Sequence, residues 1–201
     1  MTYLTIGLLV FLGVHSVAIV APAWRDQTAA RIGKGAWMGL YSLVSIAGFV
    51  LLIWGYGLAR QHPVQLYSPP VWTRHLAALL MLPVFPLLLA AYLPGRIKTA
   101  LKHPMLAAVE LWAFAHLIAN GTLADVLLFG GFLAWAVADR ISYSRRPVRP
   151  LHTAPPSKLN DLIAVVAGLV IYFAFAFWLH VRWIGVSPFV ITLPQAVLAP
   201  A

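Results

Sequence analysis

Residues 103–139 read HPMLAAVELWAFAHLIANGTLADVLLFGGFLAWAVAD, and this stretch decides how the rest of the chain is interpreted. It contains two apolar runs joined by the turn-forming pair Asn120-Gly121. Polar and ionisable side chains inside a membrane segment are costly, so each of them needs a partner or a function. Among the residues of this kind in the stretch, those that most need an explanation are His103, Glu110, His116, Asn120 and Asp125.

The composition of the whole chain is that of an integral membrane protein. Of its 201 residues, 62% are hydrophobic and only 9% are charged, whereas soluble domains carry about 25% charged residues. The length fits one membrane domain, residues 1–201, without a soluble appendage. Because the chain has no cysteine, disulfides, thiolate ligands and cysteine nucleophiles are excluded, and His, Asp, Glu and Met are left as possible ligands.

Hydrophobic runs predict an all-α, polytopic bundle of about six transmembrane helices, since about 20 apolar residues cross a bilayer. Pro104 falls at the first position of one helix, where its missing N–H costs nothing, and Pro83 and Pro86 should interrupt another. The predicted spans are 3–22, 36–59, 72–93, 104–119, 122–138 and 160–180, with the last helix reaching about residue 182.

Lysine and arginine are distributed unequally between the two sides of this bundle. Of the 14 basic residues, 11 lie in the connections after the first, third and fifth spans. The positive-inside rule places these connections in the cytoplasm and both termini on the non-cytoplasmic side of the membrane. The Pro- and Arg-rich residues 141–159 read as a cytoplasmic link. The net charge of +9 therefore reflects the orientation of the chain in the membrane, and nucleic acid is not an expected partner.

Two histidines are predicted to lie at similar depth in the bilayer. A helix rises about 1.5 Å per residue, so His15 lies about 18 Å below the outer edge of the first span. His116 belongs to a span of opposite direction and lies about 12 Å below that edge in a core about 30 Å thick. Two imidazoles on facing helices at matched depth can ligate one haem iron, although a histidine can equally form only an interhelical hydrogen bond.

The remaining polar groups leave alternatives open. His75, early in the third span, is a rival partner for His116, and His103 shares a helix face with Glu110, seven residues on. Glu110 can orient a ligating imidazole or belong to a proton path. The other candidates are Asn120 and Asp125, which can cap the hairpin between spans four and five, and Arg25 and Arg74, which can hold haem propionates.

Several short motifs make the chain resemble the NnrU family of bacterial membrane proteins, which includes the plastid 15-cis-ζ-carotene isomerase as a distant relative. The resemblance covers most of residues 1–140, whereas residues 141–201 resemble the bacterial members only. Its carriers are His15-Ser16 followed by Arg25, Arg74-His75-Leu76, His103-Pro104-Met105 with Trp112 and His116 downstream, and Asn120-Gly121 with Asp139-Arg140.

This resemblance implies a membrane domain that binds haem b. In the isomerase, the axial ligands are the histidines that match His15 and His116, and the positions of His75 and His103 are histidines too. For the bacterial family, the resemblance implies an association with denitrification, in nitrite and nitric oxide reduction. One position departs from the isomerase pattern: Ala113 stands where the isomerase has a cysteine that can replace an axial ligand.

Three functions follow as expectations. The first is a haem b protein in the membrane that acts as a redox or accessory partner of the nitrogen-oxide reductase machinery. The second is an enzyme, a haem-dependent cis-trans isomerase of a carotenoid-like polyene dissolved in the bilayer, which the absence of a thiol at Ala113 disfavours. The third is a cofactor-free transporter or assembly factor in which His103, Glu110 and Asp125 form a proton or ion path, and the lack of inverted halves counts against it.

Overall fold

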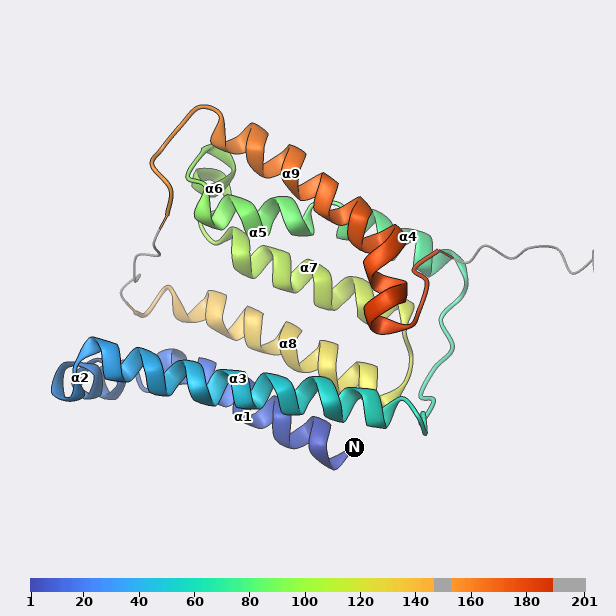
Figure 1. Ribbon diagram of the computed structural model, residues 1–201, viewed down its shortest axis with the longest axis horizontal. Helices are drawn as coiled ribbons and strands as arrows, with labels where there is room; N and C mark the ends of the chain where they lie inside the picture. Colours follow the sequence, from blue (N-terminus) through green and yellow to red (C-terminus); the bar gives the residue numbers. More distant parts are fainter. Residues whose placement is uncertain (147–152, 190–201) are drawn as a thin grey trace, which may run out of the picture.

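The computed structural model describes residues 1–146 and 153–189, and these residues form an all-helical bundle (Figure 1). Prolines and glycines set most helix limits, as the sequence predicts. The elements of the described residues are α1 (Thr2–Val20), α2 (Pro22–Ile32), α3 (Lys34–Ala59), α4 (Trp72–Met81), α5 (Val84–Tyr92), α6 (Arg96–Leu101), α7 (Pro104–Ala119), α8 (Leu123–Ser142), α9 (Asn160–Ala174) and its π-helical continuation η1 (Phe175–Ile184).

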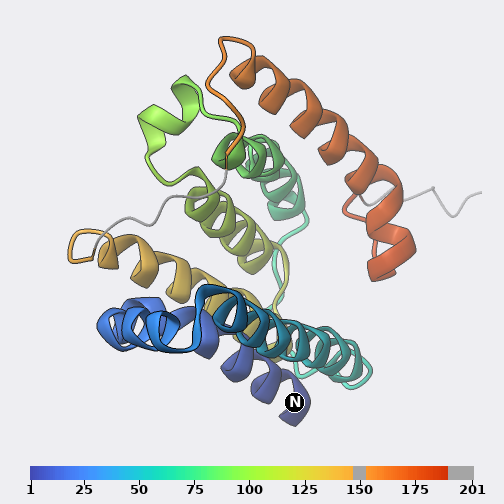
Figure 2. The ribbon, with the colours of Figure 1, turned by 60° about the vertical axis from the view of Figure 1, so that its left-hand side comes forward.

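The long helices pack as a series in which α8 lies at the centre. Helix α8 contacts α1 on one side and α7 on the other, while α3 packs on α1. Beyond α7 the series continues with α5 and then α9, an order that Figures 1 and 2 show from two directions. Any site shared by the first and fourth predicted spans must therefore be built against α8.

Glycines allow α1 and α3 to approach closely. A Cβ added at Gly55 would lie 2.6 Å from the carbonyl carbon of Tyr3, and one at Gly48 would lie 2.8 Å from the backbone nitrogen of Phe11. Small residues at such positions are typical of helix pairs in membranes, where close packing replaces the hydrophobic effect as the driving force. This pairing fixes the position of α1, the helix that carries His15.

The residues that were expected to begin or interrupt helices do so in the structure. Pro104 occupies the first turn of α7. Thr122 and Asp125 form a capping box at the start of α8, in which each side chain accepts from the other residue's backbone N–H. The predicted interruption of the third span is present as well, because α4 ends at Met81 and α5 begins after Pro83.

The last helix is tied to the bundle at its first residues. The Asp161 carboxylate accepts hydrogen bonds from the backbone N–H groups of Arg96 (2.7 Å) and Ile97 (3.1 Å), so it caps α6 from another helix. Further along α9, a Cβ at Gly168 would lie 2.6 Å from the Cα of Pro86 in α5. Helix α9 is thus packed against α5 and α6.

Four helices are long and apolar enough to cross a membrane: Thr2–Val20, Lys34–Ala59, Trp72–Tyr92 and Asn160–Ile184. The apolar helix α7 has only 16 residues, and every 18-residue window of α8 contains Asp125, Asp139 and Arg140. Large apolar side chains on the outside of the bundle fit a lipid environment; Leu9, Leu43 and Val170 are 69%, 66% and 63% exposed. The structure thus supports four spans directly, and six spans stay a prediction.

The described parts of the three basic connections lie at one end of the bundle. Figure 1 shows α2, α6 and the end of α8 together at the left, opposite the N-terminus. Two of these connections contain short helices that the hydrophobic pattern alone does not predict, and α8 continues to Ser142, four residues beyond the predicted end of that span. The predicted link over residues 141–159 lies partly outside the described residues, since 147–152 are not among them.

Candidate functional site

A stripe of aromatic side chains on α8 brings the two central histidines into one group. Phe129, Phe132 and Trp135 are spaced three residues apart, so they lie on neighbouring turns of the helix. Rings of α1 and α7 pack against them from the two sides. We refer to His15, Phe11, Trp112, His116, Phe129, Phe132 and Trp135 as the histidine–aromatic cluster.

His15 lies where α1 meets α3 and α8. Its ring centroid is 4.3 Å from that of Phe11, and it meets Tyr41 of α3 and Trp135 of α8 edge-on at 5.3 and 6.0 Å. Its Nδ1 lies 2.7 Å from the carbonyl oxygen of Phe11, one turn earlier in α1. Three aromatic neighbours and one backbone bond therefore fix the orientation of the imidazole.

His116 has a closely similar environment on α7. Its ring stacks on Phe129 at 4.6 Å and lies 5.5 Å from Trp112. Its Nδ1 lies 2.8 Å from the carbonyl oxygen of Trp112, again the residue one turn earlier. Each histidine thus makes the same kind of hydrogen bond to the backbone of its own helix, and each packs against aromatic rings.

This hydrogen bond determines which ring nitrogen of each histidine is free to bind a ligand. A carbonyl oxygen can only accept, so Nδ1 carries the proton and a neutral ring presents the lone pair of Nε2. Within the described residues, neither Nε2 of His15 nor that of His116 makes a hydrogen bond. An imidazole with Nδ1 bonded to a carbonyl and Nε2 available is the usual form of a metal-ligating histidine.

The rings of His15 and His116 are connected only through other aromatic side chains in this structure. His15 and His116 make no ring contact with each other; instead Phe132 lies between their neighbours, 5.7 Å from Phe11 and 5.4 Å from Trp112. Nearby, the indole Nε1 of Trp135 is buried without a hydrogen-bond partner among the described residues. The cluster thus combines two available imidazole nitrogens with one unsatisfied buried donor.

Asn120 and Asp125 support the ends of the helices that carry the cluster. The Asn120 side chain donates to the carbonyl oxygen of His116 at 2.9 Å, and Asp125 accepts from Tyr56 of α3 at 2.6 Å in addition to capping α8. Gly121 lies against the backbone of Tyr67, whose N–H donates to the Gly121 carbonyl oxygen. Asn120 and Asp125 thus make capping contacts, and a further role of either residue in a site stays a prediction.

His103 and Glu110 belong to a separate polar group at the basic end of the bundle. Arg140 of α8 donates to both carboxylate oxygens of Glu110, from Nε at 2.7 Å and from Nη2 at 2.8 Å. The His103 ring stacks on Tyr143 at 4.0 Å. Burial, together with the positive charge of Arg140, lowers the pKa of His103. Glu110 is therefore an ion-paired side chain that joins α7 to α8.

The other predicted site residues do not join the histidine–aromatic cluster. His75 and Arg74 are exposed on α4, and neither makes a side-chain hydrogen bond or ring contact within the described residues. Arg25 pairs with Asp26 at 2.7 Å, and its guanidinium lies 5.8 Å from the centre of the Trp37 ring. These contacts hold Arg25 at the surface of α2.

Several partners in this region have no local sequence signal. Arg140 stands 30 residues from Glu110, and Tyr56 stands 69 residues from Asp125, so only the packing of three helices brings them together. The i, i+3 spacing of Phe129, Phe132 and Trp135 was visible in the sequence, but it is equally typical of an ordinary packed helix face.

Across residues 1–146 and 153–189, no group of three or more His, Cys, Asp or Glu side chains is arranged to hold a metal ion. No curated protein and no solved structure shows a significant match to the chain. A family model, described as NnrU protein, matches residues 3–188, which include every helix from α2 to η1 and all of α1 except its first residue, Thr2. The apolar helices and the family agree with the resemblance that the histidine motifs indicated, and the chain belongs to the NnrU family.

Proposed function

We propose that this protein binds one haem b in the membrane, and that the Nε2 atoms of His15 and His116 would hold its iron. The observation that carries the proposal is the matched pair of imidazoles on α1 and α7, each fixed through Nδ1 by the carbonyl oxygen of the preceding turn. Both rings support this role chemically because histidine nitrogen is a common axial ligand of haem iron.

The donor set and its surroundings suit such a group. Phe11, Trp112 and the α8 stripe provide an apolar, aromatic environment in which water is scarce. The unpartnered Nε1–H of Trp135 can donate to a polar atom of a bound molecule. Phe132 lies between Phe11 and Trp112, the neighbours of the two histidines, so its side chain would have to move aside for a haem to bind there.

The bound haem would supply one-electron redox chemistry, and the chain would supply orientation and exclusion of water. We place this activity in a multi-pass protein of the bacterial inner membrane with six spans and both termini on the non-cytoplasmic side. As a member of the NnrU family, the protein would act as a redox or accessory partner in nitrite and nitric oxide reduction.

The two alternative functions receive less support. For a haem-dependent isomerase of a carotenoid-like polyene, Ala113 is the critical position, and it is fully buried in the core between α1, α3 and α8 with no thiol to exchange for an axial imidazole. For a transporter or assembly factor with a proton path, the carboxylates of Glu110 and Asp125 are already engaged, the first by Arg140 and the second by Thr122 and Tyr56.

The proposal is tested by absorption spectra of the full chain purified in detergent, oxidised and reduced, after expression with a haem supply. We expect a Soret band in the wild-type protein and in His62→Ala and His75→Ala, and its loss in the double variant His15→Ala/His116→Ala. His62 lies in an exposed connection and His75 on the exposed side of α4, so they control for removal of any histidine. A colourless wild-type protein, or a full band in the double variant, would refute haem ligation by this pair.

A further inference from the structure

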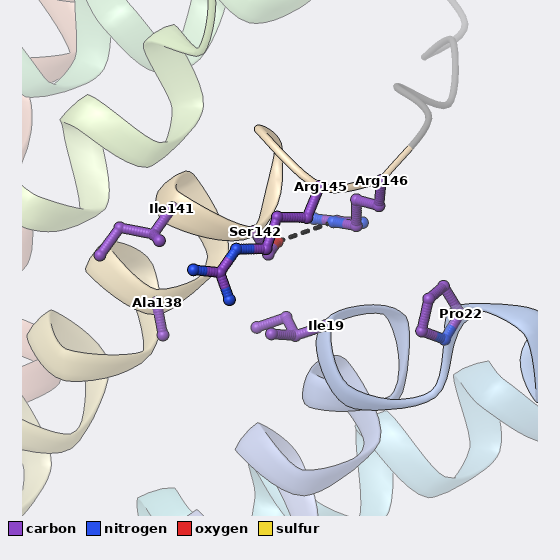
Figure 3. Close-up of a pocket in the computed structure, with 7 residues that line it drawn as sticks. All are labelled: Ile19, Pro22, Ala138, Ile141, Ser142, Arg145 and Arg146. Carbon is purple, nitrogen blue, oxygen red and sulfur yellow. Dashed lines mark hydrogen bonds between the residues drawn. The ribbon is translucent and has the colours of Figure 1, made fainter.

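A second site lies at the basic end of the bundle, away from the histidine–aromatic cluster. It is a pocket of about 300 Å³ between the α1–α2 junction and the last turns of α8. This volume is at the lower end of the range for sites that bind small molecules. Figure 3 shows its lining side chains: Ile19, Pro22, Ala138, Ile141, Ser142, Arg145 and Arg146.

The two arginines of this pocket have different surroundings. The Arg146 side chain is only 7% exposed, and it is held by Asp139, by the Ser142 Oγ at 2.8 Å, and by the Tyr143 ring, 4.2 Å from its guanidinium carbon. Arg145 is exposed and has no carboxylate partner among the described residues. Because Asp139 offsets the charge of Arg146, the pocket keeps a net positive charge through Arg145.

Apart from Ser142, the rest of the wall is apolar, and it comes from the α1–α2 junction and from α8. Ile19 stands in the last turn of α1, one of the helices able to cross a bilayer, and Ala138 and Ile141 stand on α8. Ile141 is 56% exposed, so the pocket is open to the surroundings of the bundle. A positive charge from Arg145 beside the apolar side chains of Ile19, Ala138 and Ile141 matches a molecule with an anionic head and an apolar tail.

We propose that this pocket binds the phosphate headgroup of an anionic membrane phospholipid, with Arg145 contacting the phosphate and Ile19, Ala138 and Ile141 contacting the upper part of the acyl chains. Its position at the end of α1 is the level at which lipid headgroups meet a membrane protein. Basic pockets between membrane helices are recurrent sites for anionic headgroups. Arg146, neutralised and buried, shapes the pocket and holds the end of α8.

The experiment titrates the full chain in detergent with dioleoylphosphatidylglycerol or dioleoylphosphatidylcholine and counts bound lipid by native mass spectrometry. We expect the wild type to prefer phosphatidylglycerol, and Arg145→Gln to lower its affinity about fivefold, the effect of one basic residue near a headgroup. Ala138→Leu, which fills the apolar wall without changing charge, should weaken both lipids. The matched control is Arg96→Gln, which removes a positive charge that is also exposed, from α6 at the same end of the bundle.

The outcomes separate the possible sources of the effect. An equal loss in Arg145→Gln and Arg96→Gln would overturn the site and indicate a general charge effect. Competition by glycerol 3-phosphate at the concentration at which the lipid binds would overturn the assignment to lipid, because that compound has the phosphate without the chains. Loss of the preference in Arg145→Gln alone, without competition by glycerol 3-phosphate, is the expected result.

Discussion

Replacing Gly55 by alanine tests the packing that positions α1 and therefore His15. The new Cβ would lie 2.6 Å from the carbonyl carbon of Tyr3 and 2.8 Å from the Cα of Leu4. Both contacts are with backbone atoms, which cannot turn away as a side chain can. The two helices must therefore separate or shift along each other, and overpacking of this kind costs about 1–3 kcal/mol.

Gly57 provides the matched control on the same helix. A Cβ at Gly57 meets no atom within 4 Å, so Gly57→Ala adds a methyl group without a clash. Alanine is favoured over glycine in a helix by about 1 kcal/mol, and both variants receive that gain. The difference between them thus isolates the clash, and we expect Gly55→Ala to be less stable than Gly57→Ala by about 1–3 kcal/mol.

The assay is thermal unfolding of both purified variants in one detergent, followed by circular dichroism. In a chain of this size, 1 kcal/mol corresponds to about 2–4 °C in melting temperature, so Gly55→Ala should melt at least about 2 °C below Gly57→Ala. Equal melting temperatures for the two variants would show that α1 and α3 are not packed as closely as described.

Three other predictions concern the turn at Gly121, the ion pair between Glu110 and Arg140, and the pKa of His103. Gly121→Ala should lower the melting temperature, because its Cβ would lie 2.8 Å from the carbonyl carbon of Tyr67; wild-type stability would contradict the close approach. Glu110→Ala and Arg140→Ala should show an interaction energy above about 0.5 kcal/mol in a double-mutant cycle, and additive losses would refute the ion pair. The lowered pKa of His103 means that the folded state binds fewer protons than the unfolded chain, so the stability of the protein should fall as the pH drops below about 6.5. In melting curves recorded between about pH 5 and 7.5, His103→Gln should reduce this dependence of the melting temperature on pH.

Features with a local cause could be predicted from the sequence. Pro104 at the first turn of α7, the break near Pro83 and the capping of α8 by Thr122 and Asp125 each depend on residues within a few positions of one another. The hydrogen bonds from the His15 and His116 rings to the backbone are also local, since each acceptor lies one helical turn earlier, but no motif in the sequence predicts them.

Features that depend on packing could not be predicted. The hydrophobic pattern showed Glu110 as an unexplained charge, and only the contact between α7 and α8 supplies Arg140 as its partner. Depth alone placed His15 and His116 at a similar level, whereas the ring of Phe132 between their neighbours depends on how α8 is rotated. The short helices α2 and α6 escaped prediction because their apolar residues are too few to form a span.

The most direct test of haem ligation by His15 and His116 is the electron paramagnetic resonance spectrum of the oxidised, haem-loaded full chain. Two imidazole ligands predict a low-spin ferric signal in the wild type and in His75→Ala. Replacing either His15 or His116 by alanine should remove one ligand and convert the signal to high spin. A high-spin signal in the wild type, or a low-spin signal that persists in both single variants, would contradict the account.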